Sequence, residues 1–311
     1  MASTPARSTR RLALIGFLTL GVFAAEASAQ DMEPRRWSHL PVGTDVAGVS
    51  YIYSKGDILV DPVLRIDNAQ VDLHTFVAAY SRYFSLEGMT ARLDVQLPVQ
   101  VGRWKGLVDG VPQSISREGL ADPRIRLSVN FLGAPALEGE ALRDYFKNHE
   151  SRTLAGLGLA IRVPLGEYMD DKLINLGENR FSFEPQLGVV HTEGPWSFEM
   201  TGSAFLYTQN NDFFDGSTLR QDPLYAVQTH VVRTFEGGFW VSAGAAYGWA
   251  GDTQIDGVNK DDARSNLLYG ITGGFSLPPV HAFRIGYFRR ETLNHLGLNS
   301  HNILVTWSMR F

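Results

Sequence analysis

Polar and apolar residues alternate with a period of two along most of the chain, most clearly at the C-terminal end. Between Ile303 and Phe311 every second residue is apolar, and the residues between them are mostly polar. A period of two places successive side chains on opposite faces of a β-strand. The C-terminal segment is therefore predicted to be a strand with one apolar face, and it ends on an aromatic residue.

The same alternation recurs upstream in segments of roughly ten residues, which is the length that a tilted transmembrane strand needs. Clear segments lie at 92–100, 124–131, 181–190, 196–207, 224–235, 239–250, 265–277 and 283–287, and less regular ones at 46–54 and 72–83. Together with the remaining segments they predict about twelve strands in a transmembrane barrel.

The connecting segments alternate between short and long, as they do in outer-membrane barrels with short periplasmic turns and long external loops. The short connectors are 86–88, 192–195, 236–238 and 278–281, and the long polar ones are 54–71, 101–121, 166–179, 208–222, 251–264 and 290–299. The connector 134–152 falls on the periplasmic side although it is long. Its apolar residues have helical spacing, which predicts a short amphipathic helix.

The predicted fold is therefore all-β: a transmembrane antiparallel up-and-down β-barrel of about 12 strands with one short periplasmic helix. The alternative is a soluble β-sandwich, whose strands also alternate. A sandwich has no reason to place aromatic residues at the ends of its apolar stripes, as this chain does at Trp196, Trp249, Tyr287, Trp307 and Phe311. Such positions are typical of the aromatic girdles of membrane barrels.

The N-terminus has the features of a secretory signal peptide. Three arginines precede the apolar run 12–25, and Ala27-Ser28-Ala29 offers the small residues that signal peptidase recognises. The alternative is a membrane anchor, but the run is shorter than the roughly 20 residues that span a bilayer. We expect a signal peptide over residues 1–29 and a single outer-membrane barrel domain over 30–311.

Composition restricts the function classes further. The chain has 311 residues, a formal net charge of -5 and no cysteine. The acidic balance argues against nucleic acid as a partner, because binding to a phosphate backbone needs a basic surface. The absence of cysteine excludes disulfides and thiolate-ligated metals.

Two stretches in the middle of the chain resemble a known family. They are Gly119-Leu-Ala-Asp122-Pro123, followed by 132–136, and Val163-Pro164-Leu-Gly166-Glu-Tyr168, followed by 175–185. They resemble bacterial outer-membrane proteins described as components of the MetA pathway of phenol degradation, and the likeness extends over about 43–311. Ala121 and Phe181 depart from the family, which more often has Gly and Trp there. The resemblance implies a barrel associated with aromatic-compound metabolism.

The sequence shows no pattern typical of catalysis, and we predict no catalytic residue, no metal site and no cofactor. The histidines have neither the His-Glu-x-x-His arrangement nor an i, i+2 pair on one strand face. His301, between Ser300 and Asn302, lacks a local triad geometry, because neighbours in a strand point to opposite faces. The acidic residues Asp252, Asp256, Asn259, Asp261 and Asp262 lack the spacing of a calcium loop, and whether they bind a cation stays open.

If the apolar stripes face lipid, a set of charged residues should face the lumen. The set comprises Arg92, Asp94, Arg124, Arg126, Arg162, Glu184, Glu199, Arg284 and Arg310. These side chains either brace a narrow barrel through salt bridges or line a selective path. The loop residues Asn175, Asn179 and Arg180 either fold into the mouth as a constriction or cap the rim.

Our leading hypothesis is a passive outer-membrane channel for small compounds. The expectation that these are aromatic or hydrophobic comes from the family resemblance. No nucleotide site or plug domain is visible, so no energy input is expected. The alternatives are a structural or adhesion barrel closed by its charges, and an outer-membrane hydrolase. Expected partners are outer-membrane lipid and lipopolysaccharide, the barrel-insertion machinery acting through Phe311, and the small-molecule substrate.

Overall fold

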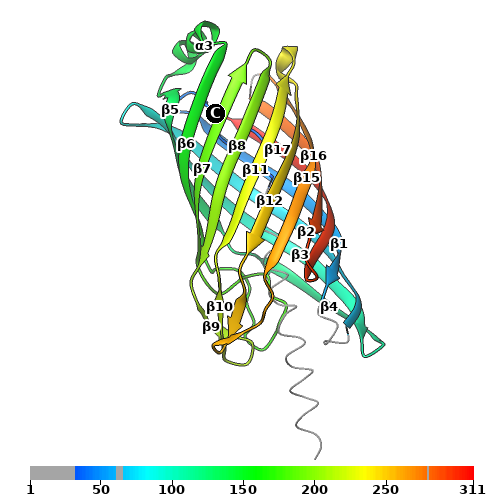
Figure 1. The fold of residues 1–311 in the computed structure, drawn as a ribbon. Helices are drawn as coiled ribbons and strands as arrows, with labels where there is room; N and C mark the ends of the chain where they lie inside the picture. The colour runs from blue at the N-terminus through cyan, green and yellow to red at the C-terminus, as the bar shows by residue number, and fades with distance from the viewer. Residues whose placement is uncertain (1–31, 61–65, 279) are drawn as a thin grey trace, which may run out of the picture.

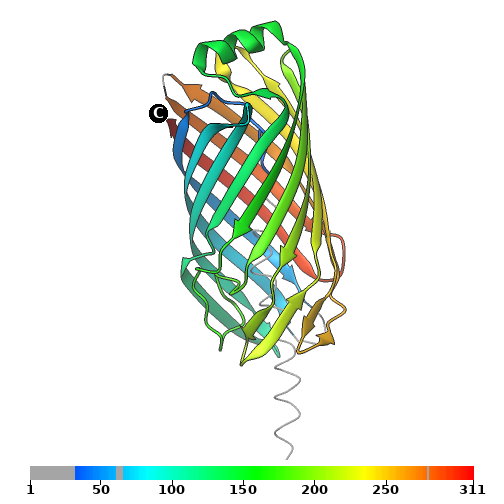
Figure 2. The same ribbon diagram turned by 90° about the vertical axis from the view of Figure 1, so that its left-hand side faces the viewer.

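The computed structural model describes residues 32–60, 66–278 and 280–311. The expected signal peptide over residues 1–29 lies outside them. In the described part of the chain, antiparallel strands form a closed barrel (Figures 1 and 2). Twelve strands make the wall: β1 (Asp45–Leu59), β2 (Ile66–Leu86), β3 (Met89–Val108), β5 (Arg124–Pro135), β6 (Ser151–Arg162), β7 (Ser182–Glu193), β8 (Trp196–Tyr207), β11 (Leu224–Thr234), β12 (Trp240–Ala250), β15 (Arg264–Leu277), β16 (His281–Thr292) and β17 (Gly297–Arg310).

The barrel closes where the first strand meets the last. β1 pairs with β17 in an unbroken register that runs from Val46 opposite Arg310 to Leu59 opposite Gly297. The chain ends join this seam, since the backbones of Asp45 and Phe311 exchange two hydrogen bonds of 2.9 and 3.1 Å. Closure leaves no free sheet edge in the wall, which a membrane requires. The predicted fold class and strand number are confirmed.

One end of the barrel carries short connections and the other carries long ones. The helix α3 (Gly139–Asn148) lies at the end with the short turns, and in Figure 1 it stands at the top near the C-terminus. Short turns mark the periplasmic end of an outer-membrane barrel. The predicted periplasmic helix is confirmed within the connector 134–152. In the described residues no helix is both long and apolar enough to cross a membrane.

The long connections contain more regular structure than the sequence pattern predicted. The segment 101–121, expected to be a loop, continues β3 to Val108 and returns as β4 (Val111–Leu120). Residues 208–222 and 251–264 form a small sheet of four strands: β9 (Asn210–Phe213), β10 (Ser217–Gln221), β13 (Thr253–Ile255) and β14 (Val258–Asn259). Its apolar core, with Phe213, Leu219 and Ile255, also holds Leu173.

Exposed aromatic side chains gather at both ends of the wall. Tyr225 and Tyr247 stack on Trp249 near the long loops. Phe275 stacks on Phe283 near the short turns, where Trp307 is also exposed. Amphipathic rings of this kind favour the two lipid–water interfaces, so the apolar band between them is the membrane-spanning surface.

Candidate functional site

The inner surface of the barrel has two chemically different sides. The side formed by β3 and β5–β8 carries buried charged and polar residues, among them Asp94, Arg126, Glu184, Gln186 and Glu199. The opposite side, formed by β1, β12 and β15–β17, is apolar halfway along the barrel. Its residues are Ile52, Ala246, Leu268, Phe288 and Leu304. A solute in this lumen would contact an apolar surface on one side and hydrogen-bonding groups on the other.

A short N-terminal segment occupies the space between these two sides. We call Met32–His39 the plug segment. Met32 packs into the apolar cluster of β12 and β15–β17. Five residues later the indole Nε1 of Trp37 donates a 2.9 Å hydrogen bond to the Thr201 hydroxyl on β8. The plug segment therefore crosses the lumen from the apolar side to the polar side.

Hydrogen bonds hold the plug segment along its whole length. The Glu33 backbone N–H donates to Gln228 Oε1 on β11 at 3.2 Å, and the Arg35 N–H donates to Glu199 Oε2 on β8 at 2.7 Å. The Arg36 guanidinium donates to the Gln186 side chain on β7. Arg35 adopts a positive φ of 61°, which turns the chain sharply between these contacts.

The strongest attachment is a chain of ion pairs. Both terminal nitrogens of Arg126 donate to the Glu33 carboxylate, at 2.7 and 3.0 Å, and Arg126 Nε donates to Asp94 at 3.0 Å. Arg92 Nε donates to the same Asp94 oxygen at 2.9 Å. A bidentate arginine–carboxylate pair is both strong and geometrically specific. The sequence pattern left two roles for these charges, bracing the barrel or lining a path, and in the structure they hold a segment that crosses the lumen.

Two glycines in the barrel wall make room for the plug segment. A Cβ on Gly188 of β7 would lie 1.8 Å from the Trp37 indole nitrogen, and one on Gly156 of β6 would lie 2.5 Å from Trp37 Cε3. Atoms cannot approach so closely, so any larger residue would displace the indole. Both positions face inward, and both glycines are needed for the docked state.

The periplasmic end of the plug segment is clamped by α3. The His39 ring makes edge contacts with Tyr145 and Phe146, at centroid distances of 6.0 and 5.5 Å. Its Nε2 hydrogen-bonds to the Pro135 carbonyl at 2.8 Å, and its buried Nδ1 has no hydrogen-bond partner in the part of the chain that the structure describes. Burial lowers the pKa of His39 below its ordinary value, and the Arg152 cation lowers it further.

Acidic pH should loosen this clamp. Because the docked pKa of His39 is lowered, docking favours the neutral ring, and this contribution is lost as the pH falls below the ordinary pKa of histidine. A protonated ring would bury an Nδ1–H donor without a partner. We expect the conductance of planar bilayers that contain the protein to be severalfold higher at about pH 5.5 than at about pH 7.5. His39→Gln keeps a donor for Pro135, and it should remove much of this difference; an unchanged difference would contradict the role of His39.

The external mouth is covered by the connection 163–181 between β6 and β7. Asp122, in the break between β4 and β5, holds it from both ends: one carboxylate oxygen accepts the Gly166 N–H and the other accepts the Glu178 N–H, each at 2.8 Å. Farther along, Ile174 and Leu176 pack into an apolar cluster with inner residues of β1–β3. The connection thus reaches across the mouth.

Asp122→Asn should release this connection. The amide can accept only one of the two N–H groups, and its own NH2 would face the other donor. Losing a buried bond to a charged group costs about 2 kcal/mol, so amide exchange at Gly166 and Glu178 should rise at least about 30-fold. Hydrogen exchange measured by mass spectrometry checks this. Asp171→Asn, at an exposed carboxylate of the same connection, is the control and should leave the exchange unchanged; equal effects would contradict the anchor.

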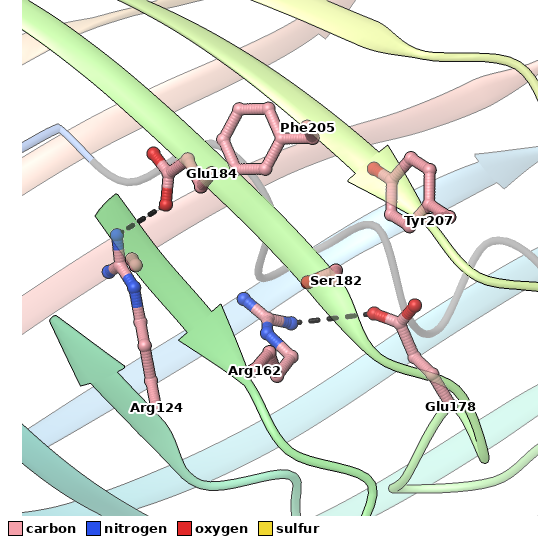
Figure 3. Close-up of a pocket in the computed structure, with 8 residues that line it drawn as sticks. Arg124, Arg162, Glu178, Ser182, Glu184, Phe205 and Tyr207 are labelled. Atoms are coloured by element: carbon pink, nitrogen blue, oxygen red, sulfur yellow. Dashed lines mark hydrogen bonds and ion pairs between the residues drawn. The ribbon is translucent and has the colours of Figure 1, made fainter. Parts of the chain in front are cut away.

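A small cavity lies on the external side of the plug segment (Figure 3). Its lining residues are Arg124, Ala160, Arg162, Glu178, Ser182, Glu184, Phe205 and Tyr207. Arg124 donates to Glu184 at 2.5 Å, and Arg162 lies 3.5 Å from Glu178. Figure 3 shows the rings of Phe205 and Tyr207 beside these pairs. The cavity combines charged groups with aromatic surface in the extracellular half of the lumen.

The structure places the nine charged residues of the predicted set as follows. Arg92, Asp94 and Arg126 belong to the ion-pair chain at the plug segment, Glu199 accepts from Arg35, and Arg124, Arg162 and Glu184 line the cavity. Arg284 is partly buried on β16, and Arg310 is exposed at the periplasmic end of β17.

The three loop residues of the prediction lie within the mouth connection. Asn175 fastens it from inside, because its side chain bonds to the Met169 N–H, the Met169 carbonyl and the Lys172 carbonyl. Asn179 donates to the side chain of Asn210 at 3.1 Å. Arg180 bonds to Glu178 and lies over the Tyr207 ring at 4.4 Å. All three hold the connection in shape.

The acidic external residues have structural partners. Asp262 accepts from both the N–H and the hydroxyl of Thr253, at 2.6 and 2.8 Å, and Asp256 accepts the Thr218 N–H at 2.8 Å. Asp252 accepts the Ala263 N–H at 2.7 Å. In the described ranges, no group of three or more histidine, aspartate or glutamate side chains has an arrangement that could hold a metal ion.

Sequence reasoning missed the plug segment and the role of Asp122. Met32–His39 shows no periodicity, and its partners lie more than 90 residues away. A usable signal was the run Glu33-Pro-Arg-Arg-Trp37, which is unusual as a mere linker before a first strand. Asp122, Gly166 and Glu178 all lie in the stretches that resemble the family, but the sequence did not indicate that these stretches contact each other.

Comparison with known proteins agrees with this architecture. The model of the family described as "Putative MetA-pathway of phenol degradation" matches residues 55–293. No curated protein matches the chain. The crystal structure of an outer membrane channel from Pseudomonas putida F1 has a TM-score of 0.73 at 19% identity, covering 90% of this chain and all of that one. The transport unit of the autotransporter AIDA-I from Escherichia coli has a TM-score of 0.53 at 8% identity, covering 96% and 98%. The fold is that of an outer-membrane barrel.

Proposed function

Because the chain belongs to the family described as "Putative MetA-pathway of phenol degradation", we propose that it is an outer-membrane channel for the passive passage of small aromatic or other hydrophobic compounds. The observation that carries the proposal is the two-sided lumen. An aromatic ring suits the apolar side with Leu268 and Phe288, and a hydroxyl or carboxylate suits the polar side with Arg126.

The plug segment sets the resting state. It crosses the lumen and is held by several specific contacts, so we propose that passage requires its displacement. The segment is short and mostly polar, and the chain continues from it to β1, which begins at Asp45. Its release would expose charged groups to water within the lumen, where hydration can replace the lost ion pairs. The channel is thus closed at rest and opens without an energy source.

Support for transport over the alternatives also comes from the plug segment. A barrel that is braced only by its own wall charges needs no additional segment to pair with Arg126 and Asp94. The outer-membrane hydrolase is less well supported, because Ser300 and Asn302 lie on the inner face of β17 whereas His301 is exposed on the outer face and bonds to Tyr287. The chemistry that remains is binding and passage.

Membrane partners follow from the same surface. We propose that outer-membrane lipid and lipopolysaccharide surround the apolar band and its aromatic girdles. We also propose that the insertion machinery recognises the last strand through Phe311, whose side chain is 63% exposed at the barrel seam. No nucleic acid partner is proposed, because the chain has a formal net charge of -5.

Influx into liposomes tests the proposal. Full-length protein and a variant that lacks residues 32–38 are reconstituted separately, and the entry of a phenolic acid is compared with that of a sugar of similar size. We expect the variant to admit the phenolic acid in preference to the sugar, and the full-length protein to admit both slowly. Equal entry would indicate a general porin. Entry of neither solute through either protein would favour the closed structural barrel.

A further inference from the structure

The ion-pair chain at the plug segment is unbalanced. It runs from Arg36 to Glu33, Arg126, Asp94 and Arg92, with nitrogen–oxygen distances of 3.8, 2.7, 3.0 and 2.9 Å. Three guanidinium groups therefore share two carboxylates, and an arginine stands at each end. Within a low-dielectric interior such an excess of one positive charge is costly unless an anion balances it.

Both ends of the chain carry buried donors without hydrogen-bond partners. Among the described residues, none accepts from Arg36 Nε, Arg36 Nη1 or Arg92 Nη2, and the Ser128 hydroxyl between them also lacks a partner. Arg36 is 2% exposed and Ser128 is 6% exposed. Native interiors seldom leave such donors unsatisfied, so a group that accepts hydrogen bonds is expected among them.

The backbone brings these donors to one place. Ser128 on β5 is the direct cross-strand neighbour of Arg92 on β3, and both side chains face inward. On the next strand, a Cβ added to Gly158 would lie 3.2 Å from Arg36 Nη2 and 3.3 Å from Ser128 Oγ. Arg36 and Ser128 therefore approach the same inward-facing point above Gly158, where even a Cβ would crowd both groups.

We propose that Arg36, Arg92 and Ser128 form a binding site for one monovalent anion, either a halide or the carboxylate of a small organic acid. Such an anion would accept from the unpartnered donors and neutralise the third guanidinium. Since Arg36 belongs to the plug segment while Arg92 and Ser128 belong to the wall, the anion would also join the plug segment to the barrel. The site is independent of whether the barrel transports anything.

Anomalous diffraction on crystals of the full mature chain tests the site and separates the two sources. One crystal is grown in sodium bromide and another in sodium 4-bromobenzoate. A halide site predicts one strong bromine peak within hydrogen-bond distance of Arg36, Arg92 and Ser128 in the first crystal. If the site binds a carboxylate, the crystal grown in sodium 4-bromobenzoate should show the carboxylate beside Arg36, Arg92 and Ser128. Its bromine peak should then lie one benzene ring away from the carboxylate. Density of water strength without a bromine signal, or bromine at surface arginines only, would overturn the proposal.

Binding in solution gives an independent measurement that does not depend on transport. Calorimetric titration of the same anions, at an ionic strength kept constant with gluconate, should show one site in the wild type. Ser128→Ala removes one donor to a charged group and should weaken binding about tenfold. Gly158→Ala should also weaken it, because the added methyl group would press on Arg36 Nη2 and Ser128 Oγ and displace them. Ser242→Ala removes a buried inward hydroxyl of β12, away from the cluster, and is the matched control with unchanged affinity; equal weakening by Ser242→Ala would refute the assignment.

If Ser128→Ala fails to fold, Arg92→Lys provides the second variant. This variant keeps the positive charge but has fewer hydrogen-bond donors, because the planar guanidinium is replaced by a single ammonium group. The proposal predicts that this variant binds the anion more weakly than the wild type while the Asp94 pair persists. Affinity equal to that of the wild type would mean that Arg92 is not a ligand.

Discussion

Deleting residues 32–38 should convert a closed barrel into a conducting one. In planar bilayers we expect the mean conductance to rise at least about tenfold, because the deletion removes the segment that crosses the lumen. The wall residues left behind, among them Arg126 and Glu199, then face water and are solvated. The deletion leaves residues 1–29, where we expect the signal peptide, and β1 unchanged, so export and closure of the seam should proceed as before.

The matched control for the deletion keeps its length. Replacing residues 32–38 by seven glycine and serine residues removes every side-chain contact of the plug segment while the chain still threads the same path. If side chains hold the segment, this variant should conduct nearly as well as the deletion. Conductance equal to that of the full-length protein in both variants would contradict the assignment of a plug.

Arg126→Ala should both weaken the barrel and open it. Arg126 is 3% exposed and forms ion pairs with both Glu33 and Asp94. Its loss therefore leaves two neighbouring carboxylates without the cation that they share. Breaking a buried ion pair by removing one partner costs about 3–5 kcal/mol. We expect a lower urea midpoint of unfolding and a conductance close to that of the plug deletion.

Combining the two changes separates plug release from general damage. In the background that lacks residues 32–38, Arg126→Ala should add little to the conductance, since the segment that it releases is already absent. Arg117→Ala, at the external arginine that bonds to the Ile174 carbonyl, is the control and should leave the conductance of the full-length protein low. Reduced stability with no gain in conductance for Arg126→Ala would favour a barrel that is merely braced by its charges.

The strands could be predicted from the sequence because the membrane imposes a simple rule. Lipid on one side and polar groups on the other produce a period of two, as at Ile303, Val305 and Trp307. The rule fails where the lipid ends. Residues 101–121 keep their strand structure through the β3–β4 pairing, although most of β4 is exposed and the pattern weakens there.

The site was less predictable because it depends on contacts between distant residues. Inward-facing positions such as Arg126 followed from strand parity, but their partner Glu33 lies outside any periodic segment. The apolar inner side was missed for a related reason: Leu268 and Phe288 face inward, so their strands are apolar on both faces and resemble fully buried ones. The sequence alone does not indicate that Gly156 and Gly188 make room for Trp37.

The central claim is that the lumen is a transport path closed by the protein's own N-terminal segment. The most direct test adds a synthetic peptide of residues 30–39 to the variant that lacks residues 32–38, in a planar bilayer, from the periplasmic side. The account predicts reversible block of the current by this peptide and no block by a peptide of the same composition in scrambled order. A steady current that neither peptide changes, or a variant that carries no current at all, would contradict it.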